Sequence, residues 1–294
     1  MERIVIGLCA ALLLVFSLPG QARSLNILAL GDSYTIGEGV TAQERWPYLL
    51  GTRLAGHGYT VPNIQYLAAT GWTAADLLRA MQQTDLPVGY DLITVMVGVN
   101  NQYQGGDIDV YKYDLAKILQ RAIRLAGGNN QRVVMLSIPD YSISPMVQEQ
   151  KLSYVNIRND IRRFNRVARL VADQNNVRFV DISRQVAQAE GRREYFAADG
   201  LHFSSAMHSL WADAVTQPAL AAIGHLNTNI VTTPIPPEDT LQGATPLVQE
   251  NGWGNVIEPI TIVADPIESP QIPPPLPPVQ ATGGVSAPYT LPAT

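Results

Sequence analysis

The chain has 294 residues, of which 46% are hydrophobic and 15% are charged, so most of it can bury a core and a disordered chain or a collagen is excluded. The single cysteine excludes a disulfide scaffold and a cysteine-rich zinc site. A formal net charge of −5 without a basic cluster argues against a nucleic-acid partner.

The first 22 residues have the pattern of a secretory signal peptide. A short charged start precedes an apolar run over 4–18, Pro19 and Gly20 break that run, and Ala22 completes a small-residue cleavage site. A run of 15 residues is short for a membrane span, and an uncleaved anchor is the alternative. Cleavage after Ala22 removes Cys9 from the mature protein. The signal-peptide pattern predicts a secreted or periplasmic protein without a transmembrane span.

Residues 23–225 alternate between apolar runs and amphipathic stretches. The apolar runs predict buried strands at 25–30, 64–68, 91–97, 132–138 and 177–181. The amphipathic stretches predict helices at 47–56, 73–81, 110–126, 153–174 and 205–223. Strands that alternate with helices in this way predict a single α/β domain of three layers, with a parallel five-stranded sheet between helices.

Residues 226–294 differ sharply from this domain. They contain no lysine or arginine, six acidic residues and 14 of the 21 prolines. The net acidity of the chain therefore belongs to this segment, because residues 23–225 carry about +1. Such a composition favours extended polyproline conformations and predicts a disordered, low-complexity acidic tail. We interpret it as a spacer, with a docking segment for an unidentified partner or a wall-spanning stalk as the alternative.

Chemically useful residues follow the predicted strands. Ser33 comes after the first strand, Gly71 after the second and Asn100 after the third, while Asp199 and His202 stand on a loop before the last helix. The carboxyl ends of parallel strands meet at one edge of a sheet, where ligands bind. We therefore expect these residues to converge on one site.

These residue types suit nucleophilic catalysis. A serine hydroxyl becomes a nucleophile when an imidazole takes its proton, and a carboxylate orients that imidazole. Ser33, His202 and Asp199 fit these roles, while the backbone N–H groups of Ser33 and Gly71 and the amide of Asn100 suit an oxyanion hole. The sequence has no nucleotide-binding glycine motif, no G-x-S-x-G elbow and no clustered metal ligands, so we expect neither a cofactor nor a metal.

The same residues resemble the SGNH (GDSL) hydrolase family, whose four letters match Ser33, Gly71, Asn100 and His202. The resemblance covers about residues 25–225 and rests on four blocks in the family's order, ALGDSYTIGEG, AATGWTAADLL, VGVNNQY and DGLHFS. It implies a flavodoxin-like fold, with Ser33 as nucleophile, His202 as base and Asp199 as its partner. It also implies lipid, thioester, aryl ester or acetylated sugar substrates.

Two positions depart from the family's usual pattern. Asn101 stands where the family often has aspartate, which puts hydrogen bonding around the oxyanion site in question. Phe203 stands where the family often has proline, and it is expected to shape the pocket. We also predict that Tyr34, Trp72 and Phe203 line the substrate site, with simple packing as the alternative.

The other ionisable residues are interpreted as structural. His57, His208 and His225 are read as surface or core residues, and Asp181 as a local hydrogen-bond acceptor rather than a rival triad acid. Four arginines of the predicted helix at 153–174 are interpreted as a solvated helix face rather than a phosphate site: Arg158, Arg162, Arg163 and Arg166.

The sequence thus predicts an exported serine esterase that acts on a small-molecule, glycan or lipid ester. An acyltransferase on the same site and a non-catalytic binding protein on this fold are the alternatives. Covalent labelling by a fluorophosphonate would separate the enzyme from the binding protein.

Overall fold

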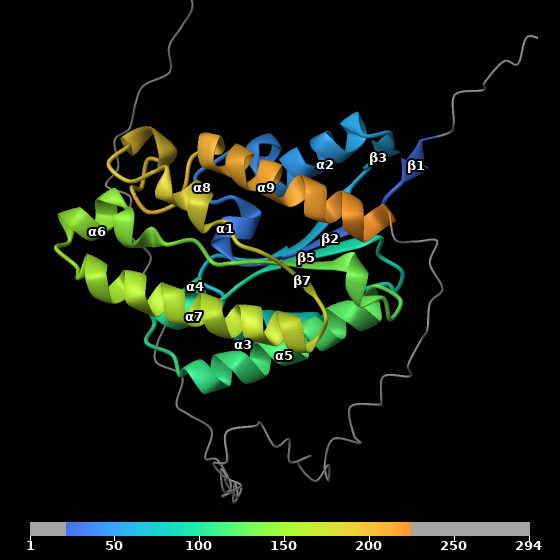
Figure 1. The fold of residues 1–294 in the computed structure, drawn as a ribbon, viewed down its shortest axis with the longest axis horizontal. Helices are drawn as coiled ribbons and strands as arrows, with labels where there is room; N and C mark the ends of the chain where they lie inside the picture. Colours follow the sequence, from blue (N-terminus) through green and yellow to red (C-terminus); the bar gives the residue numbers. More distant parts are fainter. Residues whose placement is uncertain (1–21, 225–294) are drawn as a thin grey trace, which may run out of the picture. The chain divides into compact units, whose positions relative to one another are not determined.

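The computed structural model describes residues 22–224 (Figure 1). The predicted leader, apart from Ala22, and the predicted tail lie outside these residues. Five strands form one parallel sheet in the order β4-β2-β5-β6-β7, which confirms the predicted sheet. Their bounds are Ile27–Gly31 (β2), Ile64–Ala68 (β4), Leu92–Met96 (β5), Val133–Leu136 (β6) and Arg178–Val180 (β7). A two-residue ladder that the sequence does not predict joins β1 (Arg23–Ser24) to β3 (Tyr59–Thr60).

The burial of the strands explains their order in the sheet. Every residue of β2, β5 and β6 is buried, because central strands of a parallel sheet are covered on both faces. Every residue of β4 is only half-buried, as expected for a strand at the edge. The chain leaves β2 toward β4 and then returns to place β5 on the other side of β2. The switch point of the sheet therefore lies between β2 and β5, where ligands bind in open α/β folds.

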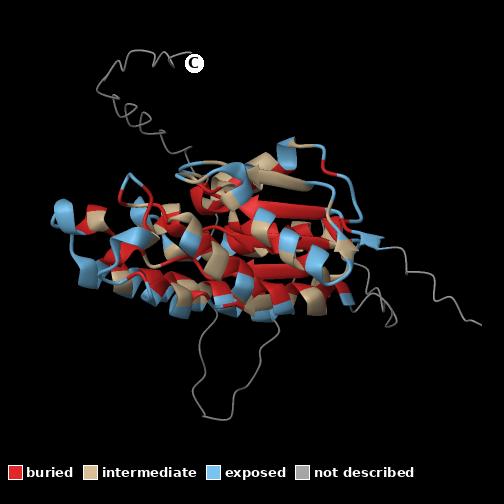
Figure 2. Cartoon of the chain, turned by 90° about the horizontal axis from the view of Figure 1, so that it is seen from above, coloured by how far each residue is buried: buried red, intermediate tan, exposed pale blue. Residues whose placement is uncertain are grey.

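Helices cover both faces of the sheet, with α2 and α9 on one side and α3, α5 and α7 on the other (Figure 1). The longer helices are α2 (Trp46–Gly56), α3 (Ala74–Gln83), α5 (Ile108–Leu125), α7 (Tyr154–Gln174) and α9 (Ser205–Gly224). These five match the predicted helices. Figure 2 shows buried residues in the middle layer and exposed residues on the outer helix faces, and the buried apolar side chains form one core cluster.

Four short helices go beyond the prediction: α1 (Ser33–Ile36), α4 (Val99–Tyr103), α6 (Pro145–Glu149) and α8 (Ser183–Ala187). They are too short for a 3.6-residue periodicity to be recognised in the sequence. Two of them matter for the site, because α1 begins at Ser33 and α4 contains Asn100. Within residues 22–224, no helix has the length and apolar character needed to cross a membrane.

Candidate active site

The register of the sheet brings the predicted residues to one edge. Gly31, the last residue of β2, lies opposite Ala68 on β4 and Met96 on β5. Three strands therefore end at the same level, and the segments that follow them face one another. Ser33, Gly71 and Asn100 follow these strand ends, so the alignment allows them to converge on one site as predicted.

Ser33 is the first residue of α1 and is held by the residue before it. The Oδ1 atom of Asp32 accepts a hydrogen bond from the Tyr34 backbone N–H at 3.1 Å and so caps the helix. Ser33 itself is 4% exposed. Asp32 is fully buried, and burial raises the pKa of its carboxyl to about 7 against the hydrogen bonds that would lower it.

Asp199 and His202 meet within one turn of the chain. The Nδ1 atom of His202 lies 2.5 Å from Oδ2 of Asp199, while Oδ1 accepts hydrogen bonds from the backbone N–H groups of Leu201 and His202. Burial would raise the pKa of Asp199, but these hydrogen bonds outweigh it and hold the pKa below its usual value. An ionised carboxylate thus orients the imidazole and leaves Nε2 free for chemistry.

Two predicted oxyanion donors lie beside the serine. Gly71 has a φ of +79°, a conformation that favours glycine, and a Cβ atom there would point into open space. The Asn100 amide donates one hydrogen bond to the Trp72 carbonyl at 3.0 Å. An amide nitrogen carries two hydrogens, so this bond orients the group and leaves a second donor.

Asn101 performs a structural task that accounts for its departure from the family pattern. It is 7% exposed, and its Oδ1 atom accepts a hydrogen bond from the backbone N–H of Ala74 at 2.8 Å. Ala74 is the first residue of α3, so Asn101 ties the start of that helix to α4. A carboxamide oxygen accepts this bond as a carboxylate oxygen would. Asn101 therefore makes a hydrogen bond that an aspartate at this position could also make.

The predicted catalytic and oxyanion residues, except Asp199, line one cleft of about 160 Å³. Its lining consists of Ser33, Tyr34, Thr70, Gly71, Val99, Asn100, Tyr103, Tyr141, Leu201 and His202. The structure therefore brings together side chains from the ends of four strands and from the turn before α9. Asp199 stands behind His202 and reaches the cleft through it.

Two tyrosines of the cleft are missing from the sequence analysis. Tyr103 ends the VGVNNQY block, and Tyr141 follows β6 by a few residues. Their rings meet edge to face with centroids 6.1 Å apart. The signal that identifies Tyr141 is its position shortly after the fourth predicted strand, because the ends of parallel strands meet where ligands bind. Burial raises the pKa of Tyr141 to about 12, so its hydroxyl stays neutral and donates to Gln102.

Of the three aromatic residues predicted to line the substrate site, one lines the cleft. Tyr34 lies in the cleft, with its ring centroid 5.5 Å from that of His202. The prediction that Phe203 lines the site is wrong, because its side chain is fully buried and packs against Tyr34 and Trp211. Trp72 is also absent from the lining, and its side chain packs against the core. Phe203 directly follows His202, but its side chain points away from the cleft because the turn ends at His202.

The remaining polar residues take structural places. Asp181 accepts a hydrogen bond from the Ser183 N–H and faces Arg169 at 3.6 Å, so it is not the carboxylate on His202. His208 is buried, and its Nδ1 atom accepts a hydrogen bond from the Trp46 N–H. His57 is exposed in a turn, and His225 lies outside the described residues.

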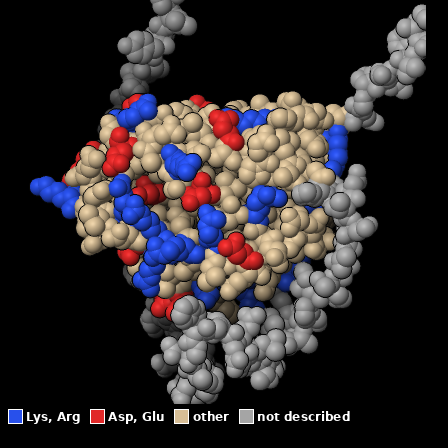
Figure 3. Space-filling view, in the orientation of Figure 1, with Lys and Arg blue, Asp and Glu red and all other residues tan. Residues whose placement is uncertain are grey.

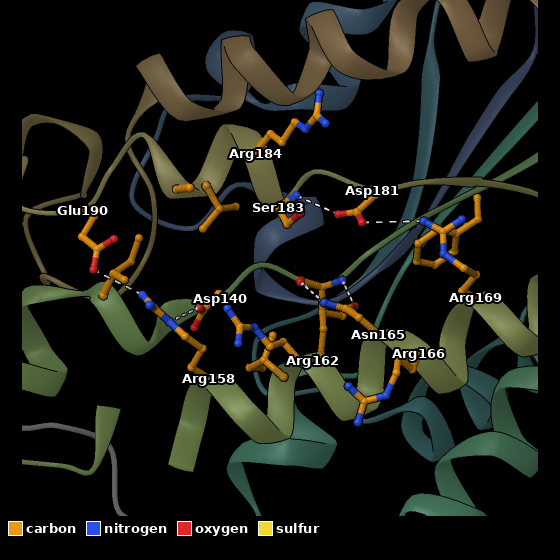
Figure 4. Close-up of a pocket in the computed structure, with 16 residues that line it drawn as sticks. Asp140, Arg158, Arg162, Asn165, Arg166, Arg169, Asp181, Ser183, Arg184 and Glu190 are labelled. Atoms are coloured by element: carbon orange, nitrogen blue, oxygen red, sulfur yellow. Dashed lines mark hydrogen bonds and ion pairs between the residues drawn. The ribbon is translucent and has the colours of Figure 1, made fainter. Parts of the chain in front are cut away.

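Three of the four arginines noted in the sequence line a second, larger cavity of about 500 Å³ between α7 and α8 (Figure 4). Figure 3 shows basic side chains gathered over α7. Arg158 pairs with Asp140 and Glu190. Within the described residues no ion pair reaches Arg162, Arg166 or Arg184, and Arg184 points away from α7 in Figure 4. The unpaired guanidinium groups therefore do not converge on a common point.

The cleft has the parts required for acyl transfer, while no histidine is among the described residues that line the arginine-lined cavity. Ser33 and His202 face the same cleft, although no hydrogen bond joins their side chains in the described part of the chain. Such bonds are often long until a substrate binds. Among residues 22–224, no three His, Cys, Asp or Glu side chains are grouped so that they could hold a metal.

The model of the GDSL-like lipase/acylhydrolase family matches residues 29–210, which is more than half of the chain. The chain belongs to this family. All five predicted catalytic and oxyanion residues lie within the matched range, so the resemblance seen in the sequence is confirmed as family membership. The matched range also includes β4, β5, β6 and β7 in full and the last three residues of β2.

Individual relatives are more distant. An arylesterase from Vibrio mimicus is 31% identical over 135 residues, which span 45% of this chain and 65% of that protein. A lipase/acylhydrolase from Enterococcus faecalis has 20% identity and a TM-score of 0.52, covering 68% of this chain and 95% of the other. An acetyl-xylooligosaccharide esterase from Geobacillus Stearmophilus has 19% identity, the same TM-score and the same coverage. At these identities the solved structures show a shared fold.

Proposed function

We propose that this protein is a serine-dependent carboxylic ester hydrolase that works through an acyl-enzyme. The observation that carries the proposal is the cleft, in which Ser33 and the Asp199-oriented imidazole of His202 stand beside two further hydrogen-bond donors. Membership of the acylhydrolase family and an arylesterase among its relatives support the same activity.

In the first half of the reaction, the Ser33 hydroxyl attacks the ester carbonyl while His202 takes its proton at Nε2. The carbonyl oxygen becomes an oxyanion, for which the backbone N–H groups of Ser33 and Gly71 and the Asn100 amide are the donors. Asp199 stabilises the imidazolium that forms. The imidazolium then protonates the departing alcohol, and an ester between Ser33 and the acyl group remains.

In the second half, water attacks the acyl-enzyme. His202 takes a proton from this water, the same donors hold the oxyanion, and the imidazolium returns the proton to Ser33 as the acid leaves. The hydrolase and acyltransferase alternatives differ only at this point, in whether water or another alcohol attacks.

The size of the cleft favours a small acyl or aryl group. A volume of about 160 Å³ lies below the range typical of drug-sized ligand pockets. Val99, Tyr103 and Leu201 give its wall an apolar character suited to such a group.

A p-nitrophenyl ester series from acetyl to palmitoyl, assayed on the purified protein and its Ser33→Ala variant, tests this proposal. We expect turnover that is highest for the short esters and a loss of about 10⁴-fold or more in kcat for Ser33→Ala, because the nucleophile is gone. Full activity in a correctly folded Ser33→Ala variant would reject the serine mechanism. Absence of turnover, together with absence of fluorophosphonate labelling, would favour a binding protein.

We further propose that the hydrolase is exported, on the strength of the signal pattern in residues 1–22. N-terminal sequencing of the mature protein from expressing bacteria should begin at Arg23. A mature protein that keeps Met1 would support the anchor instead.

A further inference from the structure

A second carboxylate faces the imidazole of His202. The Oε2 atom of Glu38 lies 3.7 Å from Nε2, the ring nitrogen on the opposite side from the one that contacts Asp199. Glu38 has no role in the mechanism above. It belongs to the same sequence block as Ser33, ALGDSYTIGEG, but an acidic residue in a glycine-rich segment gives no signal by itself.

The backbone fixes the place of Glu38. Its N–H donates a hydrogen bond to the Ser33 carbonyl at 3.0 Å. The next residue, Gly39, has a φ of +83°, and a Cβ atom there would lie 2.5 Å from Cβ of Ala197. Glycine thus lets this loop approach the turn that carries His202. The loop after the nucleophile and the turn of the base are packed together, and Glu38 sits where they meet.

The side chain of Glu38 is held as well. The Thr70 hydroxyl donates a hydrogen bond to Oε2, the same oxygen that faces His202. Thr70 precedes the oxyanion residue Gly71, so the contact links three loops of the cleft. A separation of 3.7 Å is too long for a hydrogen bond to Nε2. The interaction is therefore Coulombic, and Nε2 stays available to the Ser33 hydroxyl.

Few other charges act on this imidazole. In the described residues, the other titratable groups around it are Asp199 on its own turn, Tyr34 from α1, His208 from α9, and Tyr103 and Tyr141, which line the same cleft. Burial raises the pKa of Tyr34 well above its usual value and lowers the pKa of His208 to about 3, so both are neutral near pH 7. Among residues 22–224, the charged groups that face His202 are thus Asp199 and Glu38, one on each side of the ring.

We propose that Glu38 is a positioning residue that stabilises the imidazolium form of His202 from the Nε2 side and so sets the pH below which the enzyme loses activity. The proposal rests on the proposed esterase function. An imidazolium cannot accept the Ser33 proton, so stabilising it moves the acid limb of the kcat/KM profile to higher pH. The same charge stabilises the imidazolium that forms in the transition state, which raises the plateau.

The test is the profile of kcat/KM for p-nitrophenyl acetate from about pH 4.5 to 9, for the wild type and Glu38→Gln. We expect the acid limb of Glu38→Gln to move to lower pH by about half to one unit, the size expected for one charge at this distance in a water-like medium. The plateau should fall several-fold. Because the Glu38 side chain is 37% exposed, 1 M salt should shrink the difference.

Two further variants separate the proposed role from a general effect. Thr70→Val removes the partner that holds Oε2 and should shift the limb in the same direction by less. Glu190→Gln removes the same charge from an exposed residue that pairs with Arg158, and its limb should match the wild type. Acid limbs that coincide for wild type, Glu38→Gln and Thr70→Val, in folded proteins, would overturn the proposal.

An NMR titration of the His202 ring protons gives a readout that does not depend on catalysis. The midpoint should be lower in Glu38→Gln than in the wild type, with the exposed His57 unchanged as an internal reference. Equal His202 midpoints would overturn the role of Glu38. A wild type that hydrolyses no ester would instead count against the esterase function, while the titration still decides the interaction.

Discussion

The cleft that holds Ser33 and His202 and the arginine-lined cavity differ in every respect that matters for chemistry. The cleft measures about 160 Å³ and is lined from the ends of four strands and the turn before α9. The cavity measures about 500 Å³ and takes six of its lining residues from the single helix α7. In the cleft Ser33 and His202 are nearly buried, whereas Arg162 and Arg166 are exposed.

Size is therefore a poor guide to function in this molecule. A strand end fixes a side chain through the sheet, and several strand ends can aim different groups at one point. The exposed face of a helix presents residues of one kind in a row. Water solvates their charges, and nearby carboxylates neutralise them. The smaller cleft is preorganised, and the larger cavity is a groove between two helices. The following predictions test this contrast, from the largest expected effect to the smallest.

Asn100→Ala should lower kcat by about 10²–10³-fold, because it removes one oxyanion donor from a preorganised cleft. Its neighbour Asn101 provides the contrast. Asn101→Ala should lower the free energy of unfolding by about 1–3 kcal/mol, because it leaves the buried Ala74 N–H without its partner. Steady-state kinetics and urea unfolding of both variants measure the two effects. An Asn100→Ala enzyme with unchanged turnover would reject the oxyanion role.

Asp32, the residue directly before Ser33, should make stability fall as the pH rises. Its pKa is about 7 in the folded protein because burial disfavours the charge, and 3.8 is its ordinary value. Between these values the unfolded chain has lost the proton that the folded chain keeps, so stability drops by at most about 1.4 kcal/mol per pH unit. Asp32→Asn keeps an oxygen for the Tyr34 N–H and removes the titration.

Urea unfolding of wild type and Asp32→Asn between about pH 4 and 8 checks this expectation. The variant should gain stability relative to the wild type as the pH rises through this window and then level off. A constant difference at every pH would show that the buried carboxyl does not titrate in this range.

Substitutions in the arginine-lined cavity should have the smallest effect. Arg162→Gln combined with Arg166→Gln should leave kcat/KM within about two-fold of the wild type. It should change the free energy of unfolding by about 0.5 kcal/mol or less, since exposed substitutions rarely do more. The two side chains stand four residues apart on α7, so the double variant also relieves a like-charge contact.

Arg158→Gln is the matched variant in the same cavity. It leaves Asp140 and Glu190 without their shared partner, and it should cost more stability than the double variant. Loss of ester hydrolysis in Arg162→Gln with Arg166→Gln would show that the cavity takes part in the reaction, and the contrast between the two regions would fail.

The sequence by itself determines the sheet, the five long helices and the residues at the centre of the cleft. Apolar runs in the sequence predict the buried strands, and capping residues such as Thr73 predict where helices begin. The spacing of Asp199 and His202 within one turn makes their contact predictable, because it depends on local backbone alone.

Only the tertiary structure decides which further side chains enter the cleft. Glu38 reaches His202 through the packing of loops that lie far apart in the chain, and no local pattern encodes such packing. The same reason explains the error at Phe203, which is adjacent to His202 in sequence and yet packs on the opposite side of the turn, in the core. Local sequence fixes where a strand or turn ends, whereas the packing of several such ends fixes the direction in which each side chain points.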